Sequence, residues 1–302
     1  MRLKGGPSAA MTAALLAILP FSSSGVDAQA PASPRPPLHR AYVEGQTLHY
    51  RMTGVNEAWH YSADAKAVVK KDSNGSFYED FGWSNMVTGG KPETLAPSMA
   101  GYSQHLSLDP NVFPGAPNLN GVDPKMIGPV TDLMTFYVDY WLAAKFNQLL
   151  KPGDHFYFAN PTVPSWADGQ RVIVGEDAID FDMTLKSVDT AKGIAELEVR
   201  HVPPPQSRIH LAAAWMQTPQ PGQVNNWVQV MRTGDGQYLA GVGQEYFDVH
   251  LTISLADGKI LHGAMQNPVD TMERLCADAQ LTQCGEAKPH HLVRTIEIDL
   301  EH

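Results

Sequence analysis

The stretch 244–267, QEYFDVHLTISLADGKILHGAMQN, constrains the fold more than any other part of the sequence. From Phe247 to Leu255 apolar side chains occupy every second position, and polar ones lie between them. This is the period of a β-strand with one buried face. Asp257-Gly258 then interrupts the alternation, and the chain runs back from Lys259. A short glycine-containing loop between two such runs predicts a β-hairpin.

The length of this loop decides which residues pair. A two-residue loop would place Ile253 opposite His262 and put a histidine on the apolar face. A three-residue loop with Gly258 in the left-handed conformation keeps the apolar side chains together. Because a one-residue slip carries one strand's apolar set to the wrong face, we predict the three-residue loop. It pairs Ile253 with Leu261, Leu251 with Gly263, Val249 with Met265 and Thr252 with His262.

One long helix is predicted, from Thr131 to Leu150. Pro129 suits its first turn, and Pro152-Gly153 follows its end. Apolar side chains cover most of its circumference, which is typical of a buried helix. A second, short helix is predicted from the Asn267-Pro268 pair to about Ala279, since asparagine caps helices and proline suits their first position.

Together these patterns predict a mainly β, β-rich α+β fold. Further alternating runs occupy 47–53, 66–81 and 180–200. Long hairpins with one apolar face form a curved antiparallel sheet or an open barrel, and the buried helix at about 131–150 would pack against it. We expect a single globular domain over 41–302, with the option of duplicated halves at about 41–128 and 151–302 around the helix.

The first thirty residues have the pattern of a signal peptide. A positive start precedes an apolar core, and Ala28-Gln29-Ala30 fits a cleavage site near Ala30. Residues 31–40 follow as a proline-rich linker. We therefore expect an exported chain, periplasmic or secreted. In an oxidising compartment, Cys276 and Cys284 are expected to form a disulfide bond.

Composition and motifs exclude several classes of function. The formal net charge of -10 argues against a nucleic-acid partner, and no long apolar run predicts a membrane span after the leader. The signatures of serine hydrolases, zinc proteases and nucleotide-binding loops are absent. The sequence predicts no metal, and it identifies neither a cofactor nor an oligomeric state.

The candidate catalytic residues are His250, His262 and Asp248, on the polar face of the 244–267 hairpin. In the predicted register the two histidines are near neighbours across the strands, close enough to share a proton or a metal. The alternative is that this face is ordinary solvent-exposed surface, as is common in antiparallel sheets.

Candidate ligand-binding residues are aromatic or acidic and lie in loops or on the helix. Aromatic rings at the mouth of a β cavity bind apolar or sugar-like ligands. Asp139 lies between aromatic neighbours; enclosure there would raise its pKa, but we expect it to point into water. The complete set is Trp59, Trp166, Asp168, Trp215, Tyr140 and Asp139.

The function expected from these features is binding of an apolar or amphipathic small molecule in a cavity between sheet and helix. The alternative is an extracytoplasmic hydrolase or lyase that uses the His250, His262 and Asp248 cluster.

Overall fold

The structure, a computed structural model, describes residues 36–56, 59–114, 118–167 and 170–301. The expected signal peptide, the cleavage site near Ala30 and Asp168 lie outside the described residues. Within these ranges the chain forms one 14-stranded sheet and one long α-helix, α1 (Ile127–Phe146). Every strand pairing is antiparallel. The predicted mainly β fold is therefore confirmed.

The main path of the sheet has the strand order β4-β3-β2-β1-β14-β13-β12-β9-β8-β6, and it stays open because β4 and β6 are its ends. Three short 3-10 helices, η1 (Pro97–Gly101), η2 (Pro124–Met126) and η3 (Ala214–Gln217), lie between strands in the described chain. The strands are β1 (Thr47–Asn56), β2 (Trp59–Lys71), β3 (Phe77–Thr88), β4 (Lys91–Pro92), β5 (Gln104–Leu106), β6 (His155–Phe158), β7 (Val172–Asp177), β8 (Asp180–Asp189), β9 (Ile194–Val202), β10 (Trp227–Arg232), β11 (Tyr238–Glu245), β12 (Phe247–Ser254), β13 (Ile260–Cys276) and β14 (Lys288–Leu300).

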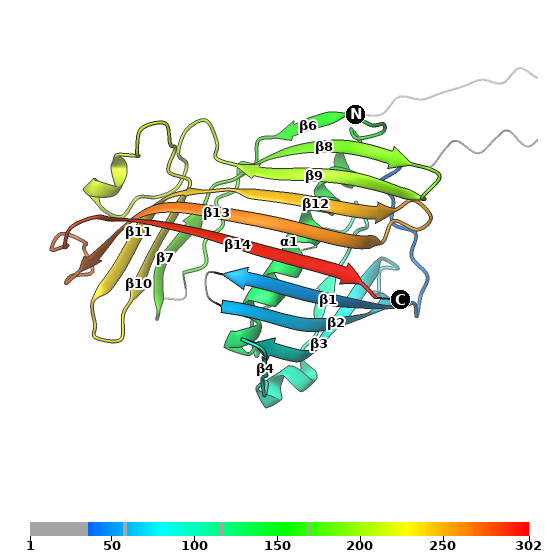
Figure 1. The fold of residues 1–302 in the computed structure, drawn as a ribbon, viewed down its shortest axis with the longest axis horizontal. Helices are drawn as coiled ribbons and strands as arrows, with labels where there is room; N and C mark the ends of the chain where they lie inside the picture. Colours follow the sequence, from blue (N-terminus) through cyan, green and yellow to red (C-terminus); the bar gives the residue numbers. More distant parts are fainter. Residues whose placement is uncertain (1–35, 57–58, 115–117, 168–169, 302) are drawn as a thin grey trace, which may run out of the picture. The chain divides into compact units, whose positions relative to one another are not determined.

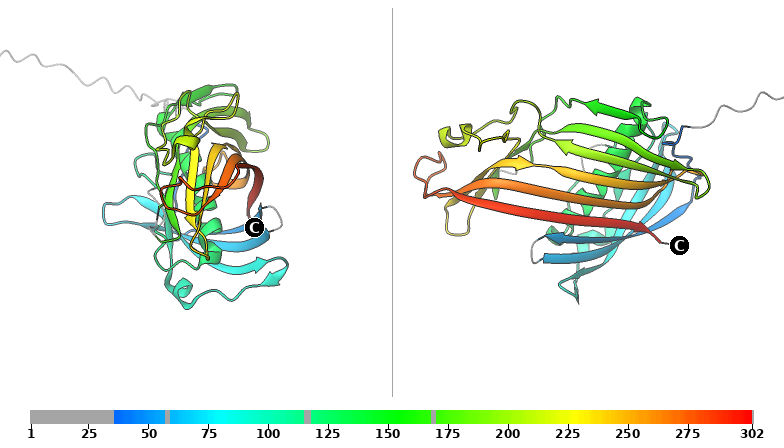
Figure 2. Two further views of the ribbon diagram at one scale, coloured as in Figure 1. Left: turned by 90° about the vertical axis from the view of Figure 1, so that its left-hand side faces the viewer. Right: turned by 45° about the horizontal axis from the view of Figure 1, so that its top comes forward.

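The long strands β13 and β14 join two parts of the sheet, as Figures 1 and 2 show. Along one edge of β13 the partner is first β12 and then β11. β11 pairs with β10, and β10 with β7, so these strands form the smaller part of the sheet, which has its own apolar core. The main core lies on the other part, where α1 covers one face of the sheet (Figure 1).

The hairpin of β12 and β13 has the predicted register over most of its length. Val249 pairs with Met265, Leu251 with Gly263 and Thr252 with His262. The prediction is wrong at the turn, where a bulge makes Ile253 pair with Ile260 instead of Leu261. The extra residue turns Ile260 fully into the core and leaves Leu261 half-buried. Gly258 has the expected positive φ, 69°.

The predicted helix exists but is displaced toward the N-terminus, since α1 ends at Phe146 rather than Leu150. Asn147 ends it in the left-handed conformation, with φ 49°, and donates its amide to the Ala144 carbonyl at 3.2 Å. Asparagine tolerates this conformation better than most residues, so it stops the helix before Pro152-Gly153.

The middle of α1 packs directly on the sheet. A β-carbon at Gly263 would lie 3.0 Å from Cδ1 of Phe136, so this glycine allows the phenyl ring to approach β13. Tyr50, Phe81, Phe136, Tyr137 and Tyr140 are all fully buried in this layer. Space for a ligand is therefore found at the flanks and ends of α1, not beneath it.

The short helix predicted after Asn267 is wrong, because β13 continues through Pro268 to Cys276. Pro268 lies where β13 changes partner, between the Gln266–Asp248 and Val269–Glu245 pairs. A missing N–H is tolerated at such a break in the ladder. The helix-start signal of Asn267-Pro268 is thus overridden by strand pairing on both sides.

The chain is already packed before the first strand. Leu38 and Arg40 are buried, although the sequence analysis assigns them to the linker. Cys276 and Cys284 are bonded, with an S–S distance of 2.00 Å, which confirms the predicted disulfide and fits an oxidising compartment. Among the described residues, no helix combines the length and apolarity needed to cross a membrane.

Candidate functional site

A pocket of about 210 Å³ lies beside α1, near the start of β12. One wall comes from the helix and the other from β8, β9 and the connection between β6 and β7. Most of its lining is apolar, but two carboxylates and a histidine also reach it. The lining residues are Met134, Thr135, Val138, Asp139, Asn160, Pro164, Asp177, Ile179, Phe181, His201 and Phe247.

Strand alternation explains why aromatic side chains form one wall of this pocket. β9 turns Ala195, Leu197 and Val199 into the core, and His201 is the next residue in phase. His201 is directly opposite Phe181 on β8 and Phe247 on β12. Its ring centroid lies 4.7 Å from that of Phe181 and 4.8 Å from that of Phe247. The imidazole is therefore held between two phenyl rings.

Asp139 of α1 supplies the partner of this histidine. Its Oδ1 lies 2.7 Å from Nε2 of His201, and the two side chains are 0% and 7% exposed. Burial raises the pKa of Asp139, and the neighbouring His201 opposes that shift. The expectation that Asp139 points into water is thus wrong, because the helix turns it toward the end of β9.

Two more acids lie close to the pair. Burial raises the pKa of Asp177 to about 6, with His201 opposing the shift. Burial, and then the charge of Asp177, raise the pKa of Glu245 to about 7, while Asn267, Arg294 and His201 oppose this. Acids with pKa values displaced toward neutrality are common at functional sites.

Glu245 belongs to a partly buried row of polar side chains beside α1. The Asn267 amide donates to Glu245 at 3.1 Å, and Arg294 donates to Asn267 at 3.2 Å and to Asp132 at 2.5 Å. Asp132 and Asp139 are two turns apart and therefore lie on one face of the helix. These contacts connect Glu245 to Asp132 at the beginning of α1.

The carboxylates of the pocket are incompletely hydrogen-bonded. Oδ2 of Asp139, Oδ1 of Asp177 and Nδ1 of His201 are buried without a hydrogen-bond partner among the described residues. Buried polar atoms are normally paired, so three such atoms at one place indicate a site for a polar group. The two carboxylate oxygens accept hydrogen bonds, which favours a ligand that donates them.

Asp180, a fourth acid nearby, is fully partnered instead. It accepts hydrogen bonds from the Tyr157 hydroxyl at 2.5 Å, the backbone N–H of Asn160 at 3.0 Å and the Arg208 guanidinium at 2.5 Å. It therefore anchors the connection after β6, which places Asn160 in the pocket wall.

The predicted catalytic residues lie on the opposite face of the sheet, away from α1. His250 contacts Asp248 at 3.2 Å, whereas His262 contacts Asp299 at 2.7 Å, so the two histidines have different partners. About half of the His250 side chain is exposed, and neither histidine lines the pockets beside α1. Ligand atoms of Glu198, Asp248 and His250 lie within 4.8 Å of one another, on two half-buried residues and one exposed residue.

The other ligand-binding candidates are dispersed. Trp166 is half-buried against Gly175, where a β-carbon would lie 2.2 Å from its Nε1. Trp215 packs in the smaller core with the Arg274 guanidinium 4.9 Å from its ring. Tyr140 is fully buried in the main core, and Trp59 is exposed. Asp168 lies outside the described residues.

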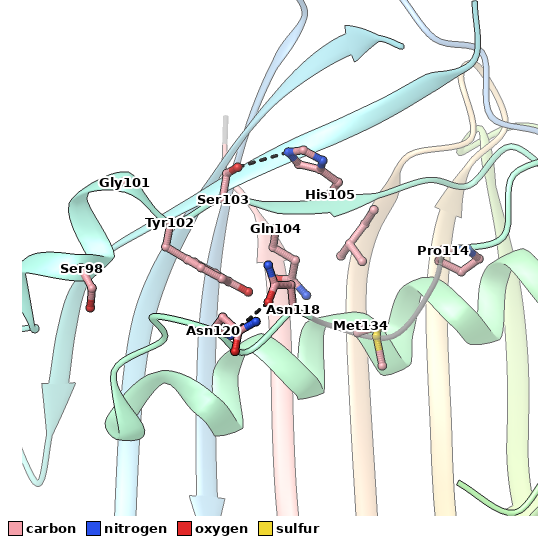
Figure 3. Close-up of a pocket in the computed structure, with 11 residues that line it drawn as sticks. Ser98, Gly101, Tyr102, Ser103, Gln104, His105, Pro114, Asn118, Asn120 and Met134 are labelled. Carbon is pink, nitrogen blue, oxygen red and sulfur yellow. Dashed lines mark hydrogen bonds between the residues drawn. The ribbon is translucent and has the colours of Figure 1, made fainter. Parts of the chain in front are cut away.

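Another pocket, of about 420 Å³, lies on the far side of Met134, where η1, β5 and the loop before α1 meet (Figure 3). Its polar contacts are local, such as Ser103 Oγ to His105 Nε2 at 3.2 Å. Gln104 is already bonded to the Val130 carbonyl and Trp83. The described residues of this pocket include no cluster of buried ionisable groups, so we place the candidate site at Asp139 and His201.

The sequence held a signal for His201 that the predictions missed. The alternation of Ala195, Leu197 and Val199, continued by two residues, turns His201 inward. No local pattern indicates Asp177 or Glu245, because only the meeting of β7, β11 and β9 brings them near His201. Comparisons with known protein families, with curated proteins and with solved structures find no match to this chain.

Proposed function

We propose that the protein binds a small amphipathic molecule in the pocket beside α1, with a cationic or hydrogen-bond-donating end at Asp139 and Asp177. The observation that supports this most is the pair of unpartnered carboxylate oxygens in an otherwise apolar pocket. A ligand ammonium group has enough hydrogens to donate to both oxygens, whereas a hydroxyl group donates to one of them, and the apolar part of the ligand would contact Val138, Ile179 and Phe247.

The charges of the pocket favour a cation over an anion. Asp139 and Asp177 are the two acids that line the pocket, and His201 is the one basic side chain among its described lining residues. An anionic group here would add repulsion in a partly dehydrated site, whereas a cation would offset the excess negative charge.

The exported ligand-binding protein expected from the sequence is part of this proposal, with the pocket beside α1 as its binding site. Export through the signal peptide at 1–30, to a periplasmic or secreted state, belongs to the same proposal, and the disulfide supports it. The alternative enzyme using His250, His262 and Asp248 has weaker support, because those side chains lie on an exposed face with separate partners.

Three six-carbon probes that differ only in the head group test this function. We expect n-hexylammonium to bind more tightly than n-hexanol, and n-hexanol more tightly than n-hexanoate, in isothermal titration at pH 7. Val138→Trp fills the pocket from the helix side and is expected to abolish binding of all three, since each lost methylene contact costs about 0.8 kcal/mol.

The control is the same substitution on exposed Val293 of β14, which is expected to bind like the wild type. Asp177→Asn is expected to remove the preference for n-hexylammonium over n-hexanol. Tightest binding of n-hexanoate, or equal binding in Val138→Trp and the wild type, would exclude this site as the binding pocket.

A further inference from the structure

A separate pocket of about 460 Å³ lies at the beginning of α1. It is formed by the ends of β1 and β2, by η2 and the first turns of α1, and by β14, and it shares no residue with the pocket at Asp139. Its lining residues are Val55, Asn56, Trp59, Tyr61, Pro124, Lys125, Ile127, Gly128, Thr131, Asp132, Arg171, Arg294 and Ile296.

Large apolar side chains are unusually exposed around this pocket. Val55 and Trp59 are each 38% exposed, and Ile127 is 40% exposed. The Trp59 ring lies 5.0 Å from that of buried Tyr61, which supports the indole at the rim. Single exposed apolar residues are ordinary, but three that converge on one hollow indicate a surface that an apolar group covers.

The charge of this pocket is opposite to that of the whole chain. Among the described residues, Lys125, Arg171 and Arg294 line it with one acid, Asp132, whereas the chain has a formal net charge of -10. Arg294 is bonded to Asp132 at 2.5 Å, and Lys125 to Glu93 at 2.5 Å. Within the described part of the pocket, the exposed Arg171 therefore leaves a local positive excess.

We propose that this pocket binds an amphipathic organic anion. Its aromatic ring or alkyl chain would cover Trp59, Val55 and Ile127, and its carboxylate or sulfonate would pair with Arg171 beside Arg294. Guanidinium groups match the planar geometry of a carboxylate, and aromatic rims hold apolar rings. The two proposed sites therefore differ in the charge of their ligands: this pocket would bind an anionic group, and the pocket at Asp139 would bind a cationic one.

Two fluorescent probes with the same rings test the proposal on the full chain. 8-Anilinonaphthalene-1-sulfonate carries the anion, and N-phenyl-1-naphthylamine lacks it. We expect the sulfonate to bind at least about tenfold more tightly than the amine. Arg171→Gln removes a charge-assisted contact and Trp59→Ala removes an aromatic contact, and each is expected to weaken sulfonate binding about tenfold. Both side chains are exposed, so both variants are expected to keep the wild-type melting temperature.

Arg200→Gln is the matched control, because Arg200 is exposed on the outer face of the sheet. It is expected to bind the sulfonate like the wild type. Equal affinity for the two probes, or wild-type affinity in both Trp59→Ala and Arg171→Gln, would overturn the proposal. Loss of sulfonate binding in Val138→Trp would also overturn it, by placing the anion at Asp139, whereas retained binding there separates this site from the proposed function.

Discussion

The Glu79→Ala variant is expected to lose about 3–5 kcal/mol of its free energy of unfolding. Glu79 accepts hydrogen bonds from Nε and Nη2 of Arg40 at 3.0 and 2.8 Å, and from the Tyr137 hydroxyl. The Arg40 and Glu79 side chains are 0% and 1% exposed. Removing the carboxylate leaves a guanidinium buried without its counter-charge, which costs far more than a lost surface contact. Urea denaturation followed by circular dichroism measures the change.

The same substitution at Glu93 is the control, because Glu93 and Lys125 form a more exposed pair, with side chains 25% and 46% exposed. Glu93→Ala is expected to cost about 1 kcal/mol or less. Combining Arg40→Met, Glu79→Leu and Tyr137→Phe is expected to recover most of the loss, since an apolar replacement leaves no buried group unpaired. A loss below about 1 kcal/mol in Glu79→Ala would contradict this account of how residues 36–44 are held to the sheet.

The second large effect is a pH dependence that Glu245→Gln removes. Burial and the charge of Asp177 raise the pKa of Glu245 from 4.5 to about 7 in the folded state. The folded chain therefore holds this proton over a pH range in which the unfolded chain has released it. The corresponding stability is complete below about pH 4.5 and is lost as the pH rises to about 7, by up to about 3 kcal/mol.

Many exposed acids with lowered pKa values act in the opposite direction at lower pH, so the informative quantity is the difference between variants. Glutamine resembles the protonated carboxyl group and does not titrate. Relative to Glu245→Gln, the wild type is expected to lose free energy of unfolding between pH 4.5 and 7, and Asp177, with a pKa raised to about 6, adds a loss of the same sign in both proteins. Glu297→Gln, on an exposed position of β14, is expected to keep the wild-type slope. Parallel curves for the wild type and Glu245→Gln would show that Glu245 is not held protonated.

The fold could be predicted from local patterns because its hairpins are local. Alternation in β12 and β13 indicated the buried faces and the register up to Thr252, and the helix was found from its apolar surface. The bulge at Ile260 and the strand through Pro268 could not be predicted, because each depends on a third strand or on the core volume that Ile260 fills. Burial of Ile260 in the core overrides the turn geometry that the sequence favours. Strand pairing of β13 likewise overrides the helix-start preference of the Asn267-Pro268 pair.

The site was harder to predict because its residues come together only in space. Asp139 and His201 are 62 positions apart, and a helix and a strand end bring them together. Asp139 is a ligand-binding candidate from the sequence, but because buried acids are rare, the sequence alone favours a solvent-exposed side chain. The sequence favours His250 and His262 as catalytic candidates because they lie on one predicted hairpin, whereas His201 shares no predicted hairpin with a second histidine and is followed by a run of prolines. Its inward phase along β9 was the only local signal of its role.

The central claim is that the pocket beside α1 takes a molecule with a donor group at Asp139 and Asp177. A crystal structure of the protein soaked in n-hexylammonium tests this most directly, since it shows where the probe lies. We predict density for the ammonium within hydrogen-bond distance of Oδ2 of Asp139 or Oδ1 of Asp177, with the alkyl chain along Val138 and Phe247. An empty pocket at a probe concentration that saturates the protein in solution, with the ammonium bound elsewhere, would contradict the claim.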